Sequence, residues 1–280
     1  MKKMAIGFGI LLAAILIWFG GYHIYSHYMV TKLYQYIDAG DMDKAMECIE
    51  KMPNVNTLEM CLPLYYVART FTGGASMTGY PLYYAVSHKA DINIIRALLE
   101  KGADPNGTDL GFEGHYPFRY VCRNPSKCMY EKTMLLADYG VDINTGYLYI
   151  SGSFAEFSEE TKESMFLTIV YLWENGAEEW HYMGTKYERT VLHEASGWMN
   201  TEYLQKFYHN EKRPMEYLLD VQDANGETPL FNAVREGMFD NCRFLIEEGA
   251  DTGIRNNEGK TAYDVAVELG YEKEIEGLQQ

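Results

Sequence analysis

The sequence lacks the signatures by which most enzymes are identified. It contains no G-x-S-x-G nucleophile elbow and no G-x-x-x-x-G-K phosphate loop. His193 and Glu194 begin like a zinc-protease motif, but no second histidine follows one helical turn later. The many carboxylates are scattered along solvated helical stretches instead of being gathered in one motif. We therefore expect a protein with no catalytic, cofactor-binding or metal-binding residues.

Positive charge and cysteine are also scarce. The chain has 24 Lys and Arg against 40 Asp and Glu, a net charge of −16. This balance argues against binding of nucleic-acid phosphates and would attract a basic partner. The five cysteines show no metal-ligand spacing. Cys122 and Cys128 would stand at the end of one helix and the start of its antiparallel partner, so a disulfide and two buried thiols are both open interpretations.

One long apolar run occurs, near the N-terminus. Residues 4–22 carry no charge and follow Lys2 and Lys3, and 19 helical residues can cross about 30 Å of hydrocarbon. A cleaved signal peptide is the alternative, but Trp18 and Phe19 occupy the place where small residues should precede a cut. We expect residues 1–30 to form a transmembrane anchor and short linker. Because positive flanks resist crossing, the rest of the chain should lie on the outer, periplasmic side of the inner (cell) membrane.

Residues 223–256 show the internal pattern most clearly. Thr228 can cap a helix with its hydroxyl, and Pro229 suits the first helical position. Gly237 should end this helix, Asp240 should cap a second one, and Gly249 should end that. The same signals return 33 residues later, starting at Thr261.

A 33-residue period with Thr-Pro-Leu at the first helix and Gly-Ala-Asp after the second resembles the ankyrin repeat. The resemblance implies an all-α solenoid over residues 31–280, with about six to seven repeats and irregular parts at 57–80 and 145–190. It also implies that the ring of His193, in the fourth position of the motif, hydrogen-bonds the turn and joins neighbouring repeats. The residues to which it gives structural roles are Thr190, His193, Thr228, Pro229 and Gly249.

Three connections between repeats are long and aromatic: residues 107–116, 145–154 and 178–189. Ankyrin proteins typically bind with these loop tips and with the concave face of the first helices, and the resemblance implies the same here. The alternative is that each ring covers the core of an irregular neighbour. The candidate protein-binding residues are Phe112, Tyr116, Tyr147, Tyr149, Trp180, Tyr182 and Tyr187.

Together these features predict a non-catalytic, membrane-anchored ankyrin-repeat protein that binds another protein. An acidic, outward-facing array with specialised repeats would suit an immunity protein that neutralises a toxin in the periplasm. The alternative is a scaffold that organises a cell-envelope protein complex.

Overall fold

The computed structural model of this chain describes residues 20–22, 24–26, 28–56, 80–88, 90–107, 116–145, 157–177, 189–271 and 273–274. Within these ranges every regular element is a helix. The chain divides into two compact units, Met1–Val121 with Met134–Asp142, and Cys122–Thr133 with Ile143–Gln280. The boundary passes through α6 (Pro117–Arg123) and α7 (Met129–Asp138), and η1 (Ile143–Thr145) follows it.

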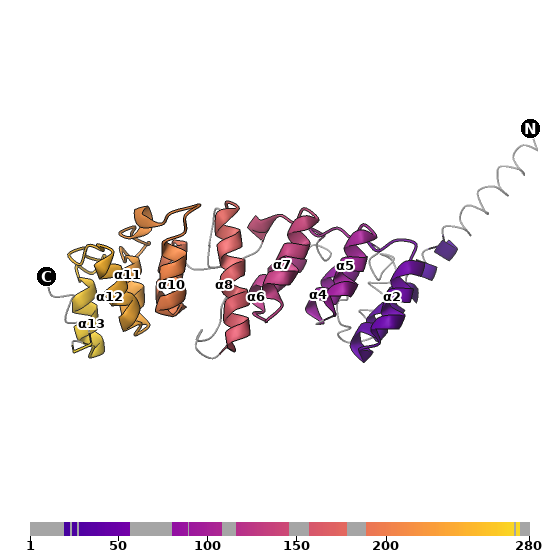
Figure 1. The fold of residues 1–280 in the computed structure, drawn as a ribbon, viewed down its shortest axis with the longest axis horizontal. Coiled ribbons are helices and arrows are strands. Elements are labelled where there is room, and N and C mark those ends of the chain that lie inside the picture. Colours follow the sequence, from indigo (N-terminus) through magenta and orange to yellow (C-terminus); the bar gives the residue numbers. More distant parts are fainter. Residues whose placement is uncertain are drawn as a thin grey trace, which may run out of the picture. The chain divides into compact units, whose positions relative to one another are not determined.

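The first unit is built from short helices joined by tight turns. Residues 28–39 are helical, and α2 (Met42–Lys51), α4 (Pro81–Ser87) and α5 (Ile92–Glu100) follow. Gly40 has a φ of 69°, which glycine adopts without strain, and this ends the helix over 28–39. The Asp41 carboxylate then caps α2 by accepting from the Lys44 N–H at 3.2 Å. The helix α5 packs against both α4 and α2, and Figure 1 shows α4 and α5 side by side.

Asparagine side chains join successive repeats of the first unit. Asn56 donates from Nδ2 to the Gly102 carbonyl at 2.7 Å, and its Oδ1 accepts from the Asp104 N–H at 2.9 Å. Asn106 makes the same two bonds one repeat later, to the carbonyl of Gly140 and the N–H of Asp142. Each amide thus satisfies one backbone acceptor and one backbone donor of the next repeat. We call this arrangement the asparagine bridge.

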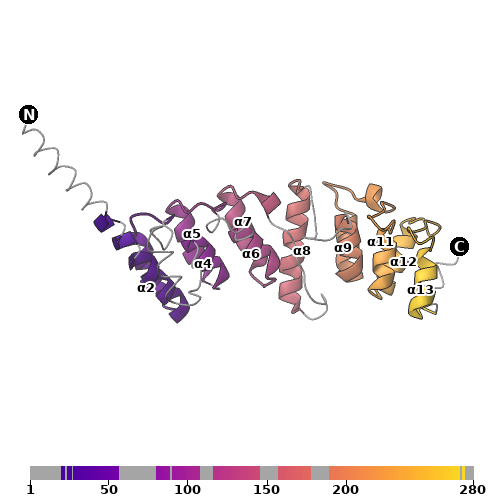
Figure 2. The same cartoon turned by 180° about the vertical axis from the view of Figure 1, so that it is seen from behind.

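The second unit contains one long helix, the 16-residue α8, and several short ones. Its helices pack so that α11 contacts α9, α12 and α13, while α10 contacts α9 and α12; Figure 2 shows α11, α12 and α13 side by side. The elements are α8 (Glu159–Glu174), α9 (Val191–Trp198), α10 (Thr201–Tyr208), η3 (Glu216–Leu218), α11 (Pro229–Arg235), α12 (Phe239–Glu247) and α13 (Ala262–Leu269).

Two turns of the second unit are built identically, 33 residues apart. The Asp223 N–H donates to the Glu227 carbonyl at 2.8 Å, and the Asn256 N–H donates to the Lys260 carbonyl at 2.9 Å. In both turns the side-chain Oδ1 of the first residue accepts two backbone N–H groups, which is why Asp or Asn stands there. Gly226 has a φ of 74°, and a Cβ there would lie 2.7 Å from Oδ1 of Asn257 in the next turn. Only glycine lets the two turns stack this closely.

The extension between α10 and η3 folds back onto the end of α8. The Arg213 guanidinium lies over the Trp173 ring at 3.7 Å from its centroid and donates to the Trp173 carbonyl at 3.0 Å. In return the Trp173 indole N–H donates to the Arg213 carbonyl at 2.7 Å. Lys212 and Asn210 both bind the carboxylate of Glu174. This set of contacts, the α8 clasp, satisfies carbonyls that a helix end leaves open.

The structure corrects three local predictions. Thr228 precedes α11 without a side-chain capping bond, and its backbone carbonyl instead accepts from the Phe231 N–H at 2.9 Å. Asp240 lies inside α12, whose capping position is Met238. The spacing of Phe154 and Phe157 predicts a first helix at this place, but Phe157 is not helical, and Ser158 caps the 16-residue helix α8 directly after it.

The predicted membrane span falls almost wholly outside the described residues, which begin at residue 20. Among the residues that the structure describes, no helix has both the length and the hydropathy to cross a membrane. The transmembrane helix over 4–22 therefore stays a prediction.

Candidate protein-binding surface

Of the seven loop aromatics predicted to bind a partner, the structure describes one. Tyr116 is half-buried and directly precedes α6. The other predicted residues lie outside the described ranges, and their role stays a prediction. They are Phe112, Tyr147, Tyr149, Trp180, Tyr182 and Tyr187.

The first helices of the first unit carry a row of aromatic side chains. Tyr83 on α4 and Tyr120 on α6 meet edge to face, with ring centroids 6.0 Å apart. The Tyr120 hydroxyl donates to the Ser87 carbonyl at 3.0 Å, which ties the two helices together. Both rings are only half-buried. A rigid, partly exposed pair of tyrosines offers a partner apolar area and a polar tip at a small ordering cost.

A second group of rings, a stack of three, is centred on Tyr84 of the same helix. Tyr84 lies between Tyr34, at 3.8 Å between centroids, and His88, at 3.7 Å. The Tyr84 hydroxyl donates to Asp38 Oδ2 at 2.7 Å. Tyr34 and Tyr84 are buried, but His88 is exposed and ends the stack. We call Tyr83, His88 and Tyr120 the first-helix aromatic face.

Sequence reasoning assigned these helical tyrosines to no binding surface. The signal was present, because Tyr83 and Tyr84 are adjacent on one helix and neighbours on a helix point about 100° apart. Both rings could not be directed into the same core. Tyr84 is 7% exposed, and Tyr83 is the ring left half-buried.

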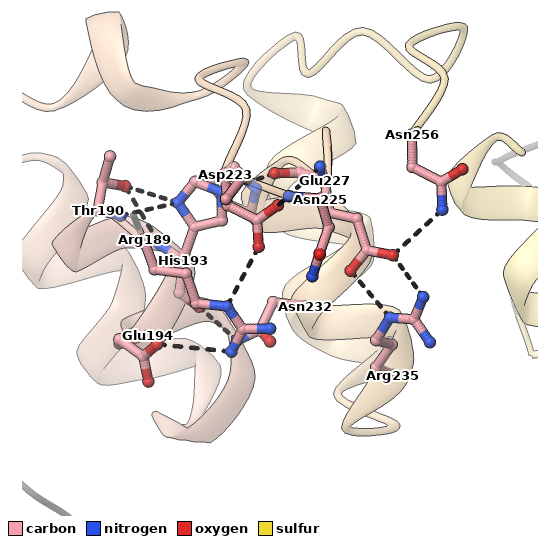
Figure 3. Close-up of polar contacts among 12 residues, drawn as sticks. Arg189, Thr190, His193, Glu194, Asp223, Asn225, Glu227, Asn232, Arg235 and Asn256 are labelled. Carbon is pink, nitrogen blue, oxygen red and sulfur yellow. Dashed lines mark hydrogen bonds and ion pairs between the residues drawn. The ribbon is translucent and has the colours of Figure 1, made fainter. Parts of the chain in front are cut away.

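In the second unit the first helices are organised around a buried histidine (Figure 3). His193 is fully buried, and the N–H of Thr190 donates to its Nδ1 at 3.1 Å. Because Nδ1 accepts this bond, the neutral ring carries its proton on Nε2 and donates to the Glu227 carbonyl at 2.9 Å. Burial lowers the pKa of His193, which keeps the ring neutral. The ring therefore joins α9 to the turn of the following repeat.

Two ion pairs surround this histidine (Figure 3). Arg189 Nε donates to the buried carboxylate of Asp223 at 3.3 Å. Arg235 Nε donates to the buried Glu227 carboxylate at 2.9 Å, and Asn256 Nδ2 reaches the same carboxylate at 3.2 Å. Each buried charge thus has a counter-charge and further hydrogen bonds, as burial requires. These contacts hold neighbouring repeats together, and they account for the polar groups around His193 without any reaction chemistry.

Glu194 lies at the edge of this cluster, 3.5 Å from Arg189. Burial raises the pKa of its carboxyl group, and Arg189 partly opposes that rise. A raised carboxyl pKa can mark a general acid. The charged groups that act on Glu194 among the described residues are Arg189 and the like-charged Glu236.

Close approach of α9 and α11 depends on Gly197. A Cβ at this position would lie 2.3 Å from Nδ2 of Asn232. That amide is buried and donates to the His193 carbonyl at 2.6 Å. Ser196 reinforces the same junction by donating from Oγ to the Pro229 carbonyl at 2.9 Å.

The sequence also predicts structural roles for Pro229 and Gly249 and a possible disulfide between Cys122 and Cys128. Pro229 is buried at the first position of α11, and Gly249 has a φ of 96° directly after α12. Cys122 and Cys128 are free thiols in the structure, and their pairing under oxidising conditions stays a prediction. Burial raises the pKa of the Cys122 thiol far above its usual range, so at neutral pH this group is a protonated core residue. Groups of three or more metal-ligating side chains are absent from the described ranges.

Comparisons with known proteins identify the repeats. Residues 192–279 match a family model described as ankyrin repeats in three copies, and residues 80–110 match the model of the single ankyrin repeat. This chain therefore contains ankyrin repeats.

Two curated relatives and one solved structure illustrate the likeness. Protein phosphatase 1 regulatory subunit 12A of Mus musculus is 30% identical over 126 residues, which are 44% of this chain and only 12% of that protein. The probable 26S proteasome regulatory subunit p28 of Saccharomyces cerevisiae is 28% identical over 197 residues, 67% of this chain and 78% of that protein. The crystal structure of the human ASB11 ankyrin repeat domain matches with a TM-score of 0.60 at 19% identity. That match covers 89% of this chain and 97% of the ASB11 chain, and it shows the fold alone.

Proposed function

We propose that the ankyrin repeats of this chain bind one protein partner and catalyse no reaction. The observation that carries this proposal is the first-helix aromatic face, where Tyr83 and Tyr120 meet edge to face and are only half-buried. Aromatic side chains held in place by neighbouring helices are typical anchors of protein interfaces. The predicted aromatic loops, including Trp180 and Tyr182, would extend this contact.

The charge distribution supports a basic partner. The residues of the second unit include 27 Asp and Glu but only 14 Lys and Arg, whereas the first unit has 13 and 10. Most of the net charge of −16 therefore belongs to the second unit. A basic protein would be attracted to it, and its association rate would fall as salt is added.

Membrane attachment through residues 4–22, with the repeats on the outer side, is part of the proposal. It is supported by the uncharged run and by the two lysines that precede it. Within this setting, capture of a toxin, the role of an immunity protein, would need a single tight partner. A scaffold of an envelope complex would bind several partners more weakly.

The test is purification of the full chain from native membranes in mild detergent, followed by identification of co-purifying proteins. One variant changes Tyr83 and His88 to Ala, a second changes Trp180, Tyr182 and Tyr187 to Ala, and the control changes Tyr217, which is 62% exposed on η3, to Ala. We expect one stoichiometric partner that the control retains and at least one of the two variants loses. If the parent chain, both variants and the control all retain the same proteins, the proposed binding site is wrong. Several substoichiometric partners would favour the scaffold.

A further inference from the structure

The first described helix has two distinct faces. Residues 28–39 are helical, and so are the described residues between 20 and 26. One face is buried against the first unit. Its members follow the helical spacing of three and four residues: Ser26, Met29, Val30, Leu33 and Ile37.

The opposite face exposes large apolar side chains. Ile24 is 74% exposed, Tyr28 is 54% exposed and Tyr25 is 46% exposed. Among the described residues, eight large hydrophobic side chains are exposed, and these three are the first of them along the chain. Their clustering over five positions of one helix, at its N-terminal end, distinguishes them from scattered surface hydrophobics.

The charge pattern around this face is unlike the rest of the chain. Residues 4–31 contain no Asp, Glu, Lys or Arg, although the chain as a whole carries 40 acidic residues. The first charge after the run is Lys32, whose Nζ lies 5.7 Å from the centre of the Tyr28 ring. Acidic residues begin only at Asp38. A face of Ile and Tyr followed by Lys, and free of acids, is the composition found where helices pass the lipid headgroups.

We propose that this face, Ile24, Tyr25 and Tyr28 with Lys32, lies in the headgroup layer of the bilayer. The inference rests on the membrane attachment proposed above. Helical rise is about 1.5 Å per residue, so Tyr25 and Tyr28 would follow the end of the span at Tyr22 by roughly 4 and 9 Å. The headgroup layer on each side is about 5–8 Å thick. Tyr25 therefore falls within this layer, and Tyr28 falls just beyond its outer edge, from where its long side chain can still reach the headgroups.

This placement fixes how the first unit meets the membrane. The buried face of the same helix is fastened to the repeats by the Cys48 thiol, which donates to the Met29 carbonyl at 3.3 Å, and by the stacking of Tyr34 on Tyr84. One face thus contacts lipid while the other packs on protein. The first unit would be held at a set angle to the bilayer surface and would not swing on a flexible tether.

The test uses the full chain in vesicles of neutral and anionic phospholipids that carry bromine either near the headgroup or near the chain ends. Tyr25→Trp, Tyr28→Trp and Gln35→Trp are compared with the parent chain, whose own tryptophan fluorescence is subtracted. Gln35 is exposed on the same helix, about 10 Å beyond Tyr28 by the helical rise, and serves as the matched control. Resistance of the parent chain to alkaline extraction from the vesicles reports attachment separately.

We expect bromine near the headgroup to quench the introduced tryptophan at positions 25 and 28. Bromine near the chain ends should quench these two tryptophans less. The tryptophan at position 35 should not be quenched by either lipid. If the chain resists alkaline extraction but the tryptophans at positions 25 and 28 are not quenched, the proposed contact of this face with the headgroups is wrong. Attachment of the chain to the membrane would still stand. That result would mean that the face lies in water or against protein. A chain that is extracted by alkali overturns both the inference and the proposed attachment, whereas the co-purification experiment tests partner binding independently.

Discussion

Gly197→Ala tests whether the junction between α9 and α11 is as tight as the structure shows. In a helix, replacing Gly by Ala normally stabilises by up to about 1 kcal/mol, because the unfolded chain loses freedom. At this position the new methyl group would lie 2.3 Å from Nδ2 of Asn232. The geometry therefore predicts the opposite sign.

The expected loss of stability in Gly197→Ala depends on how far the Asn232 amide must be displaced. Displacing the Asn232 amide breaks its 2.6 Å bond to the buried His193 carbonyl, and losing such a bond costs about 1–1.5 kcal/mol. The Ser196 hydroxyl lies 2.8 Å from that carbonyl and 2.9 Å from the Pro229 carbonyl, and it can turn its single proton to the His193 carbonyl when the amide is displaced. Crowding of a packed core adds about 1–3 kcal/mol, from which the helical gain of up to about 1 is subtracted. The net expected loss is about 1–3.5 kcal/mol.

Hydrogen exchange of backbone amides in α9 and α11, measured by mass spectrometry, reports this local stability without assuming that the whole chain unfolds at once. A loss of about 1–3.5 kcal/mol corresponds to exchange that is about 5- to 300-fold faster, since about 1.4 kcal/mol is a factor of ten. The control is the double variant Gly197→Ala with Asn232→Ala. Because the second change removes the obstructing amide, adding the methyl group to Asn232→Ala should cost little. Slower exchange in Gly197→Ala alone, or an equal cost in both backgrounds, would refute the reasoning.

Two further predictions concern the second unit. Arg213→Ala should weaken α8 by about 1–3 kcal/mol, because it removes the cation–π contact with Trp173 and a charged hydrogen bond to its carbonyl. Faster exchange at the end of α8 would show this. Lys206→Ala is the control: it removes an exposed pair with Glu202 and a longer contact with the Tyr203 ring, at 5.6 Å from the centroid, and should have little effect. The lowered pKa of His193 predicts that α9 loses stability as pH falls through about 6.5, since the unfolded ring takes up a proton there while the folded ring stays neutral. His193→Gln should reduce that pH dependence, and an unchanged dependence in the variant would contradict the role of the ring.

The sequence predicted the regular repeats because their signals are local. Glycines mark the helix ends at Gly102, Gly140 and Gly249, and each has a φ between 80° and 100° in the structure. The apolar residues Ile94, Ile95, Leu98 and Leu99 follow the helical spacing of three and four residues, and all four side chains are buried on α5. Positions that require positive φ or a continuous apolar stripe leave few alternatives for the chain.

Contacts between distant residues could not be predicted in the same way. The α8 clasp joins Trp173 to Arg213 across 40 residues, and no periodic pattern links the two positions. Thr228 has the right residue type for a cap, yet its hydroxyl makes no capping bond. The first-helix aromatic face was missed because tyrosine suits both helix interfaces and binding surfaces, and only the exposure of each ring separates the two uses.

The asparagine bridge has a consequence for how the chain can diverge. Asn56 and Asn106 each contribute a side chain, but the groups they bind in the following repeat are backbone atoms of Gly102, Asp104, Gly140 and Asp142. Backbone atoms are present whatever the side chain, so the receiving repeat needs only the correct turn shape. Mutations can therefore accumulate in one repeat without a matching change in its neighbour. A junction of this kind lets an array acquire an insertion or a degenerate repeat and still preserve the register of the repeats on either side.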